Sequence, residues 1–173
     1  MNETINNLIQ RRSVREYTER QVPDDVLSCI LEAGQYAPSG MGRQPVVMVA
    51  VRDKETRDQL SRMNAKIMGS DQDPFYQAPC VVVVLADKTA PTYLYDGSLA
   101  MGNLMNAAFS LGVDSCWIHR GKEMFQSEEG KALLKKWGIE GEYEGIGNCI
   151  LGYRKGELPA PKPRMPHRVV MVD

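Results

Sequence analysis

Four prolines, Pro159, Pro161, Pro163 and Pro166, fall within eight residues near the end of this 173-residue chain. Proline fixes φ near about −65° and has no backbone N–H, so a segment with this density of prolines cannot be helical. We expect it to reach outward as an extended arm. The apolar run 169–172 that follows has the composition of a strand. A strand at the end of an arm can pair with the sheet of a neighbouring subunit.

Four other segments have the apolar, β-branched composition of buried strands. The segment 45–51 is apolar on both faces, so we expect it to be central in its sheet. With the helices predicted between them, these strands indicate a mixed α/β layer that helices cover on both sides. The predicted strands are 45–51, 80–86, 113–118 and 145–151, and the predicted helices are 3–10, 23–37, 54–68, 94–111 and 123–137.

The helix predicted over 94–111 is the longest, and it is apolar around most of its circumference. Such a helix is buried, either in the core of its own domain or against a second subunit. Gly112 follows it directly and suits the C-cap of a helix. The composition does not distinguish a helix in the core of the domain from a helix at a subunit interface.

Size and charge narrow the class of protein. A mass of 19.4 kDa corresponds to a single domain, here residues 1–173, with 153–173 as the arm. Lysine plus arginine number 21 against 22 aspartate plus glutamate, so the chain lacks the basic excess of a nucleic-acid-binding protein. The longest wholly apolar run, 80–86, is far shorter than the ~20 residues of a membrane helix, so no membrane partner is expected. The first residues lack the features of a signal peptide, which favours a cytoplasmic location.

The cysteines and histidines do not have the spacing of a metal site. The four cysteines lie more than thirty residues apart, no CxxC is present, and the chain has two histidines. We therefore expect no metal and no thioredoxin-type dithiol. Reduced, buried thiols are the expected state of Cys29, Cys80, Cys116 and Cys149.

The run Arg11–Arg15, with three arginines and a serine, is a candidate anion site. Arginine presents bidentate donors to phosphate, and serine adds a neutral donor. In an extended segment Arg11, Ser13 and Arg15 share one side while Arg12 points away. The alternative is a solvated basic turn without a ligand.

Two glycine-containing loops are further candidates. In 38–45, glycines allow close backbone approach to a ligand, and Ser39 and Gln44 can hydrogen-bond to it. The alternative is a tight helix-to-strand connection. In 112–121, the backbone amides of 118–120 are placed to face a ligand at the end of the sheet.

The remaining candidates are isolated charges. Lys162 and Arg164 lie on the arm, where prolines would hold them for an anion or where they would simply keep the arm solvated. His119 and His167 have no carboxylate or cysteine at the spacing of a catalytic dyad. The fingerprints GxGxxG, GxxxxGK[ST], GxSxG and HExxH are absent from the sequence.

Taken together and in order, short motifs across essentially the whole chain resemble the compact members of the FMN-dependent nitroreductase family. No single motif is specific, but their order is. They are RRSVREY at 11–17, APSG at 37–40, QP at 44–45, YQAP at 76–79, DGS at 96–98, LG at 111–112, CWI at 116–118, ILGY at 150–153 and PKPR at 161–164.

The resemblance implies an α+β fold whose central, mostly antiparallel sheet is flanked by helices. It implies a homodimer that exchanges its C-terminal arms and binds FMN at the interface. Arg11, Ser13, Lys162 and Arg164 would hold the FMN phosphate, and Arg15 would lie near N1 and O2 of the ring. The full set of candidate FMN-binding residues is Arg11, Arg12, Ser13, Arg15, Pro38, Ser39, Gly40, Gln44, Asn64, Trp117, Ile118, His119, Lys162 and Arg164, with Pro38, Ser39 and Gly40 coming from the partner subunit.

The implied activity is that of an NAD(P)H oxidoreductase. The flavin N5 would accept a hydride from NADH or NADPH and pass it to a small-molecule acceptor such as a nitroaromatic or a quinone, in a ping-pong cycle. No side chain is required as a nucleophile or proton donor, which agrees with the missing triad and dyad. His119 is expected to be a pocket residue rather than a catalytic one.

Two positions depart from the family pattern. Larger members have an asparagine that contacts the pyrimidine edge of the flavin, and here Asn64 or Asp71 could take that place. Small residues are usual after Ile118, whereas this chain has His119 and Arg120. Bulk and charge there would narrow the acceptor pocket or select an anionic acceptor.

The alternatives to an NAD(P)H oxidoreductase are a specialised family member that fragments flavin or reduces an enone or a halogenated substrate, a non-catalytic flavin-binding protein, and an α/β domain without flavin.

Overall fold

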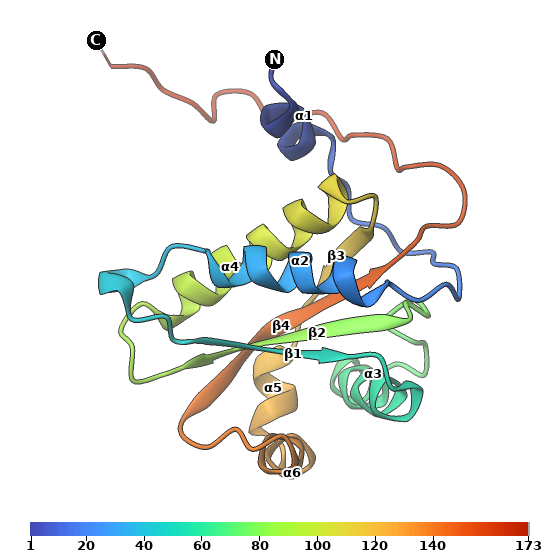
Figure 1. Ribbon diagram of the computed structural model, residues 1–173, viewed down its shortest axis with the longest axis vertical. Helices are drawn as coiled ribbons and strands as arrows, with labels where there is room; N and C mark the ends of the chain where they lie inside the picture. The colour runs from blue at the N-terminus through green and yellow to red at the C-terminus, as the bar shows by residue number, and fades with distance from the viewer. Residues whose placement is uncertain (173) are drawn as a thin grey trace.

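A four-stranded antiparallel sheet organises the chain, which a computed structural model describes over residues 1–172. In spatial order its strands are β1 (Val46–Val51), β2 (Cys80–Asp87), β4 (Tyr143–Gly152) and β3 (Asp114–Ile118), with every neighbouring pair antiparallel (Figure 1). This confirms the antiparallel sheet that the family resemblance implies.

The valine-rich strand β2 divides the core in two because successive side chains of a strand point to opposite faces. Val81 and Val83 contribute to one apolar cluster, and Val82 and Val84 contribute to the other. All four side chains are fully buried. The predicted strand 80–86 is confirmed, and its burial on both faces explains why it shows no alternation of polar and apolar residues.

Helices cover both faces of the sheet (Figure 1). The helices α2 and α4 pack on the Val82 face through residues such as Ile30 and Leu104, whereas α3, α5 and α6 pack on the Val83 face through residues such as Leu60 and Phe125. No helix within residues 1–172 is both long and apolar enough to cross a membrane. The helices are α1 (Glu3–Gln10), α2 (Asp24–Gln35), α3 (Lys54–Met68), α4 (Tyr93–Ser110), α5 (Gly121–Gln126) and α6 (Glu128–Lys136), with a 3-10 turn at Gly40–Gly42.

The prediction that 45–51 is a central strand is wrong, because β1 lies at the edge of the sheet. Val46 and Met48 pack against the cluster on one face, and Val49 and Val51 belong to the other cluster. Both faces of β1 therefore contact the core, although Val46–Val49 are only half-buried and Ala50 is exposed. An apolar residue pattern on both faces shows contact with the core on both sides, not a central position.

The single helix predicted over 123–137 is interrupted at Ser127. Ser127 has an extended backbone (φ −70°, ψ 158°), and its hydroxyl oxygen accepts a 3.1 Å hydrogen bond from the Gly130 N–H. This is an N-cap, so α6 begins directly after the end of α5. The prediction missed a serine that starts a new helix inside a continuous polar and apolar pattern.

The arm leaves β4 along the N-terminal segment. The Thr18 N–H donates to the Tyr153 carbonyl at 2.8 Å, and the Lys155 N–H donates to the Glu16 carbonyl at 3.0 Å. Beyond this base the proline segment is extended and exposed, as predicted, and the arm runs toward the end of the molecule where α1 lies (Figure 1). The strand predicted over 169–172 does not form within the single chain, and its pairing with a neighbouring subunit stays a prediction. These residues have no strand structure and are more than 80% exposed.

The prediction of four buried thiols is correct for three. Cys80, Cys116 and Cys149 are buried, whereas Cys29 is exposed on α2. Burial raises the pKa of the Cys80 thiol to about 12 and also raises the pKa of Cys116. The buried thiols therefore stay protonated at neutral pH.

Candidate functional site

A hollow of about 290 Å³ opens at the end of β3 and collects several predicted site residues. Arg15 reaches it because the N-terminal segment runs beside β3, where Ser13 forms a parallel bridge with Ser115 and the Val14 N–H donates to the Ser115 carbonyl at 3.1 Å. The hollow is lined by Arg15, Met68, Gln72, Asp73, Pro74, Tyr76, Cys116, Trp117, Ile118, His119 and Arg120.

One wall is the turn that follows β3. The fully buried Asn64 amide on α3 donates to the His119 carbonyl at 2.7 Å, and the Arg120 guanidinium donates to the Asn64 Oδ1 at 3.3 Å. Arg120 has a left-handed backbone (φ 73°) and leads into α5. The structure therefore places Asn64 behind the turn, as its support.

The opposite wall is a turn centred on Asp73. This carboxylate accepts hydrogen bonds from the Arg57 guanidinium at 2.6 Å, the Gln77 N–H at 2.7 Å, the Phe75 N–H at 2.9 Å and the Ser61 hydroxyl. Partial burial works to raise the pKa of Asp73, but these donors together lower it. The turn positions Tyr76, whose ring centroid lies 6.0 Å from the Arg15 guanidinium carbon.

The Arg11–Ser13 segment lies beside the start of β3. The buried Arg11 Nη1 has no hydrogen-bond partner within the described chain. The Arg12 Nη1 donates to the Ile9 carbonyl at 2.7 Å and to the Arg11 carbonyl at 2.8 Å at the end of α1, while the buried Arg12 Nε has no partner within the described chain. An unpaired buried guanidinium donor is costly. The Arg11 position therefore suits an anion, whereas Arg12 already contributes to the end of the helix.

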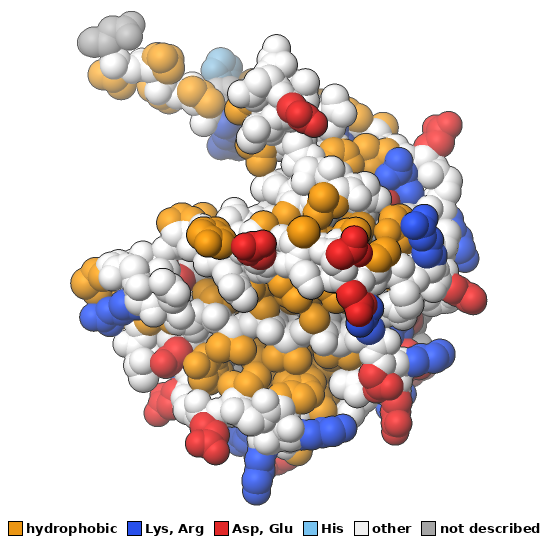
Figure 2. Space-filling view, viewed as in Figure 1, with side chains coloured by type: hydrophobic (Ala, Val, Ile, Leu, Met, Phe, Trp, Pro, Cys, Tyr) orange, Lys and Arg blue, Asp and Glu red, His pale blue; other side chains and the backbone are white. Residues whose placement is uncertain are grey.

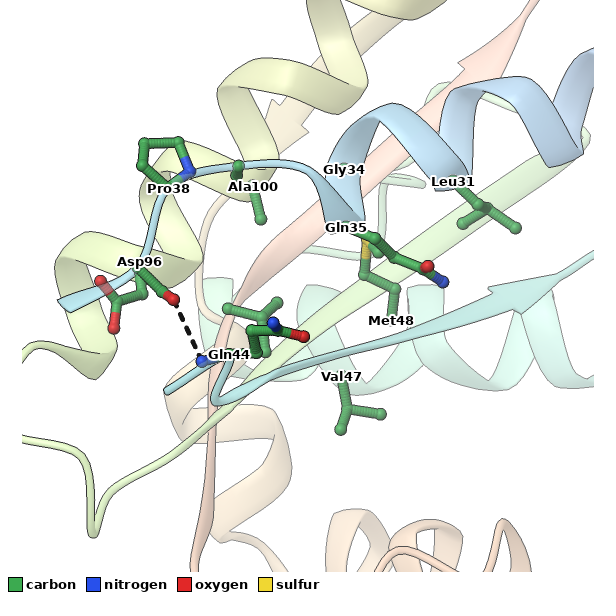
Figure 3. A pocket seen from close by; sticks show the side chains of 12 residues that line it. Leu31, Gly34, Gln35, Pro38, Gln44, Val47, Met48, Asp96 and Ala100 are labelled. Atoms are coloured by element: carbon green, nitrogen blue, oxygen red, sulfur yellow. Dashed lines mark hydrogen bonds between the residues drawn. The ribbon is translucent and has the colours of Figure 1, made fainter. Parts of the chain in front are cut away.

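The loop with Pro38, Ser39 and Gln44 lines a separate hollow of about 380 Å³ between α2, β1 and α4 (Figure 3). The Gln44 N–H donates to the Ser39 hydroxyl oxygen at 3.0 Å, which closes the loop. The Gly40 N–H donates to the Asp96 carboxylate near the start of α4 at 3.0 Å.

One chain does not bring these two groups of residues together. The Gly40 loop contacts α4 at Asp96, whereas α1, which directly precedes Arg11, contacts it where the Asn7 amide donates to the Asn106 carbonyl. Ten residues of helix separate these contacts, which is about 15 Å at 1.5 Å per residue. Lys162 and Arg164 are exposed on the arm and line neither hollow.

Sequence reasoning did not identify Asp73 or Tyr76 as parts of the site. The Asp73–Pro74–Phe75 sequence does carry a local signal, because an aspartate that accepts from the N–H two residues later forms an Asx-turn. The position of this turn opposite β3 depends on the contact between Asp73 and Arg57 of α3, and the spacing of residues in the sequence does not predict that contact.

Comparison with known proteins agrees with this fold. The model of the nitroreductase family matches residues 8–153, and the chain belongs to this family. A putative NADH dehydrogenase/NAD(P)H nitroreductase of Archaeoglobus fulgidus is 33% identical over 91% of this chain and 88% of the relative. An FMN reductase [NAD(P)H] of Bacillus subtilis is 33% identical over 98% of this chain and 73% of the relative.

The solved structures that are similar include two described with bound FMN. A nitroreductase of Bacteroides fragilis is 31% identical, with a TM-score of 0.92 and 100% coverage of both chains. A nitroreductase of Desulfitobacterium hafniense is 26% identical, with a TM-score of 0.89 and the same coverage.

The Asp73 turn yields a prediction for stability. Asp73→Asn removes a charged acceptor from Arg57 and should lower the free energy of unfolding at pH 7 by about 1.5–3 kcal/mol. Because the pKa of Asp73 is lowered in the folded state, its contribution is present above the unfolded pKa near about 3.9 and is lost as the pH falls through the folded pKa. Urea unfolding of both proteins should show a difference that shrinks in acid. A difference that does not change with pH would contradict this role.

Proposed function

We propose that this protein is an FMN-dependent NAD(P)H oxidoreductase. The observation that carries the proposal is the hollow at the end of β3, where Arg15, Trp117, Ile118 and His119 line one space. These are the residues expected around the flavin ring. The curated relatives named as NAD(P)H nitroreductase and FMN reductase, and the neighbours solved with FMN, support it.

The residues present fit the two ends of FMN. The unpartnered guanidinium donor of Arg11 and the hydroxyl of Ser13 suit the phosphate. Ser13 bridges to Ser115, and three strand residues lead from there to Ile118 at the hollow, which is about 10 Å at 3.3 Å per residue. This separation suits the ribityl chain that joins the phosphate to the ring.

A second copy of the chain would complete the site. The hollow of about 290 Å³ is just below the range of about 300–1,000 Å³ usual for ligand sites. Pro38, Ser39 and Gly40, at the far end of α4, would come from the partner subunit. Lys162 and Arg164 of the arm would add cations at the phosphate.

Exposed apolar side chains support the homodimer. They lie on α1, on the first half of α4 and along the arm, which stands clear of the body of the molecule in Figure 2. Exposed apolar side chains that gather on a few elements often mark interaction sites in soluble proteins. The side chains are Ile5, Leu8, Ile9, Leu94, Tyr95, Leu99, Met165, Val169, Val170, Met171 and Val172.

Bound FMN would supply the hydride chemistry, with NADH or NADPH as donor and a small molecule such as a nitroaromatic or a quinone as acceptor. The residues of this chain would bind and orient the cofactor. Arg15 is exposed beside the hollow and would place a fixed positive charge against the ring, which favours its reduced, anionic state. Tyr17 does not act in proton transfer, because burial raises the pKa of its hydroxyl and the hydroxyl donates to the Val14 carbonyl.

The direct test of the activity is anaerobic reduction. Purified protein reconstituted with FMN should hold about one flavin per chain and should lose its yellow colour when NADH or NADPH is added without oxygen. Stopped-flow absorbance with each donor, followed by mixing with nitroaromatics and quinones, measures both half-reactions. Bound flavin that neither donor bleaches would reject the oxidoreductase and favour a binding protein.

The phosphate assignment predicts the effect of two arginines. Arg11→Ala combined with Arg164→Ala should weaken FMN binding by on the order of 10²–10⁴-fold, since each charge-assisted contact contributes about 1.5–3 kcal/mol. Arg168→Ala is the matched control, because it removes an arm cation that has no assigned role. Quenching of FMN fluorescence gives the dissociation constants. Equal affinity in the double variant and the control would refute the assignment.

A further inference from the structure

The side chains that line the hollow at the end of β3 carry positive charge that no neighbouring acidic group neutralises. Arg15 and Arg120 line it, and neither forms a salt bridge within residues 1–172. The one acidic side chain in the lining is Asp73, and the Arg57 guanidinium 2.6 Å away compensates its charge. The chain as a whole has a net charge of −1. The two cations are therefore a local feature, and they favour a ligand with anionic or strongly accepting oxygen atoms.

Asn64 is not available to that ligand. Its side chain has no exposed surface, and its amide nitrogen donates to the His119 carbonyl at 2.7 Å and contacts the Met124 sulfur at 3.2 Å. Its amide oxygen faces Arg120. Asn64 would reach the hollow only if the turn that it supports moved away.

Arg120 instead projects from a fixed backbone. Gly121, the next residue, packs so closely on β4 that a Cβ there would lie 2.8 Å from the Gly147 nitrogen. This contact fixes the start of α5. Arg120 therefore adopts a left-handed backbone conformation that residues other than glycine rarely adopt. Its side chain is half-buried, and its bond to Asn64 Oδ1 is long at 3.3 Å, so most of its donors are free for a ligand.

We propose that Arg120, and not Asn64, provides the side-chain contact to the edge of the flavin ring, as a second cation beside Arg15. This inference rests on the proposed FMN function. The carbonyl oxygens of the ring accept hydrogen bonds, and the ring gains negative charge when it is reduced. A second fixed guanidinium stabilises the reduced ring more than the oxidised ring, and it raises the reduction potential. Asn64 acts as a positioning residue for Arg120.

The test compares the reduction potential of bound FMN in four proteins. In Arg120→Gln, the ratio of the affinity for reduced FMN to the affinity for oxidised FMN should be about tenfold lower than in the wild type. This change lowers the potential of the two-electron couple by about 30 mV. Arg120→Lys keeps the charge and should retain most of the potential. Arg62→Gln is the matched control, because Arg62 is exposed on α3 and lies outside the hollow. The fourth protein is the wild type. Spectroelectrochemical titration measures the reduction potential of bound FMN in each protein.

A further variant separates the charge from the fold. Glycine accepts the left-handed backbone at position 120, so Arg120→Gly should lower the potential as much as Arg120→Gln does while the melting temperature stays equal or rises. A role in folding alone would lower the melting temperature and leave the potential of the bound flavin unchanged.

The outcomes that overturn the inference are distinct. An Arg120→Gln protein with wild-type potential refutes the flavin contact. Wild-type potential together with a raised KM for 4-nitrobenzoate would show instead that Arg120 binds an anionic acceptor. Failure of the wild type to bind FMN would reject the proposed function itself, and this inference with it.

Discussion

The pairing of the N-terminal segment with β3 and with the base of the arm is the constraint on which the site depends. Ser13 bridges to Ser115, and Tyr17 bridges to Arg154. The Arg154 Nη1 donates to both oxygens of the buried Asp114 carboxylate, at 3.0 Å each. A buried carboxylate tied in this way is costly to separate from its partner. These contacts bring residues from both ends of the chain to one edge of the sheet.

The same edge explains how a chain without a catalytic triad supports oxidoreductase chemistry. Cations and unpartnered donors gather there: Arg11 near the start of β3, and Arg15 and Arg120 at its end. In our proposal the cofactor carries out the reaction, and the protein supplies charge, orientation and an enclosed space. The polar network around Asn64 and Asp73 keeps the two walls of the hollow in place.

The sequence predicted the elements whose signal is local. The valine-rich strand 80–86 and the helix at 3–10 are confirmed, and the ordered motifs identify the family and its antiparallel sheet. The central position of 45–51 was predicted wrongly because side chains on both faces of the edge strand β1 pack against the core. The strand at 169–172 is absent from the single chain.

The arrangement of the site was less accessible from sequence. The motif at 11–17 pointed to Arg11 and Arg15, but spacing did not show that Arg12 would bind to the end of α1. Whether Asn64 faces the hollow or supports its wall depends on how α3 packs against the turn after β3, which is a long-range contact. The separation of the Ser39 loop from α1, which precedes Arg11, follows from the length of α4.

The central claim is that two chains share the flavin sites. Sedimentation velocity of the FMN-loaded protein, recorded at the visible absorbance of flavin, tests this claim most directly. The account predicts that the flavin sediments with a particle of twice the 19.4 kDa chain mass, with about one FMN per chain. Flavin that sediments with a single chain, or a dimer that carries no flavin, would contradict it.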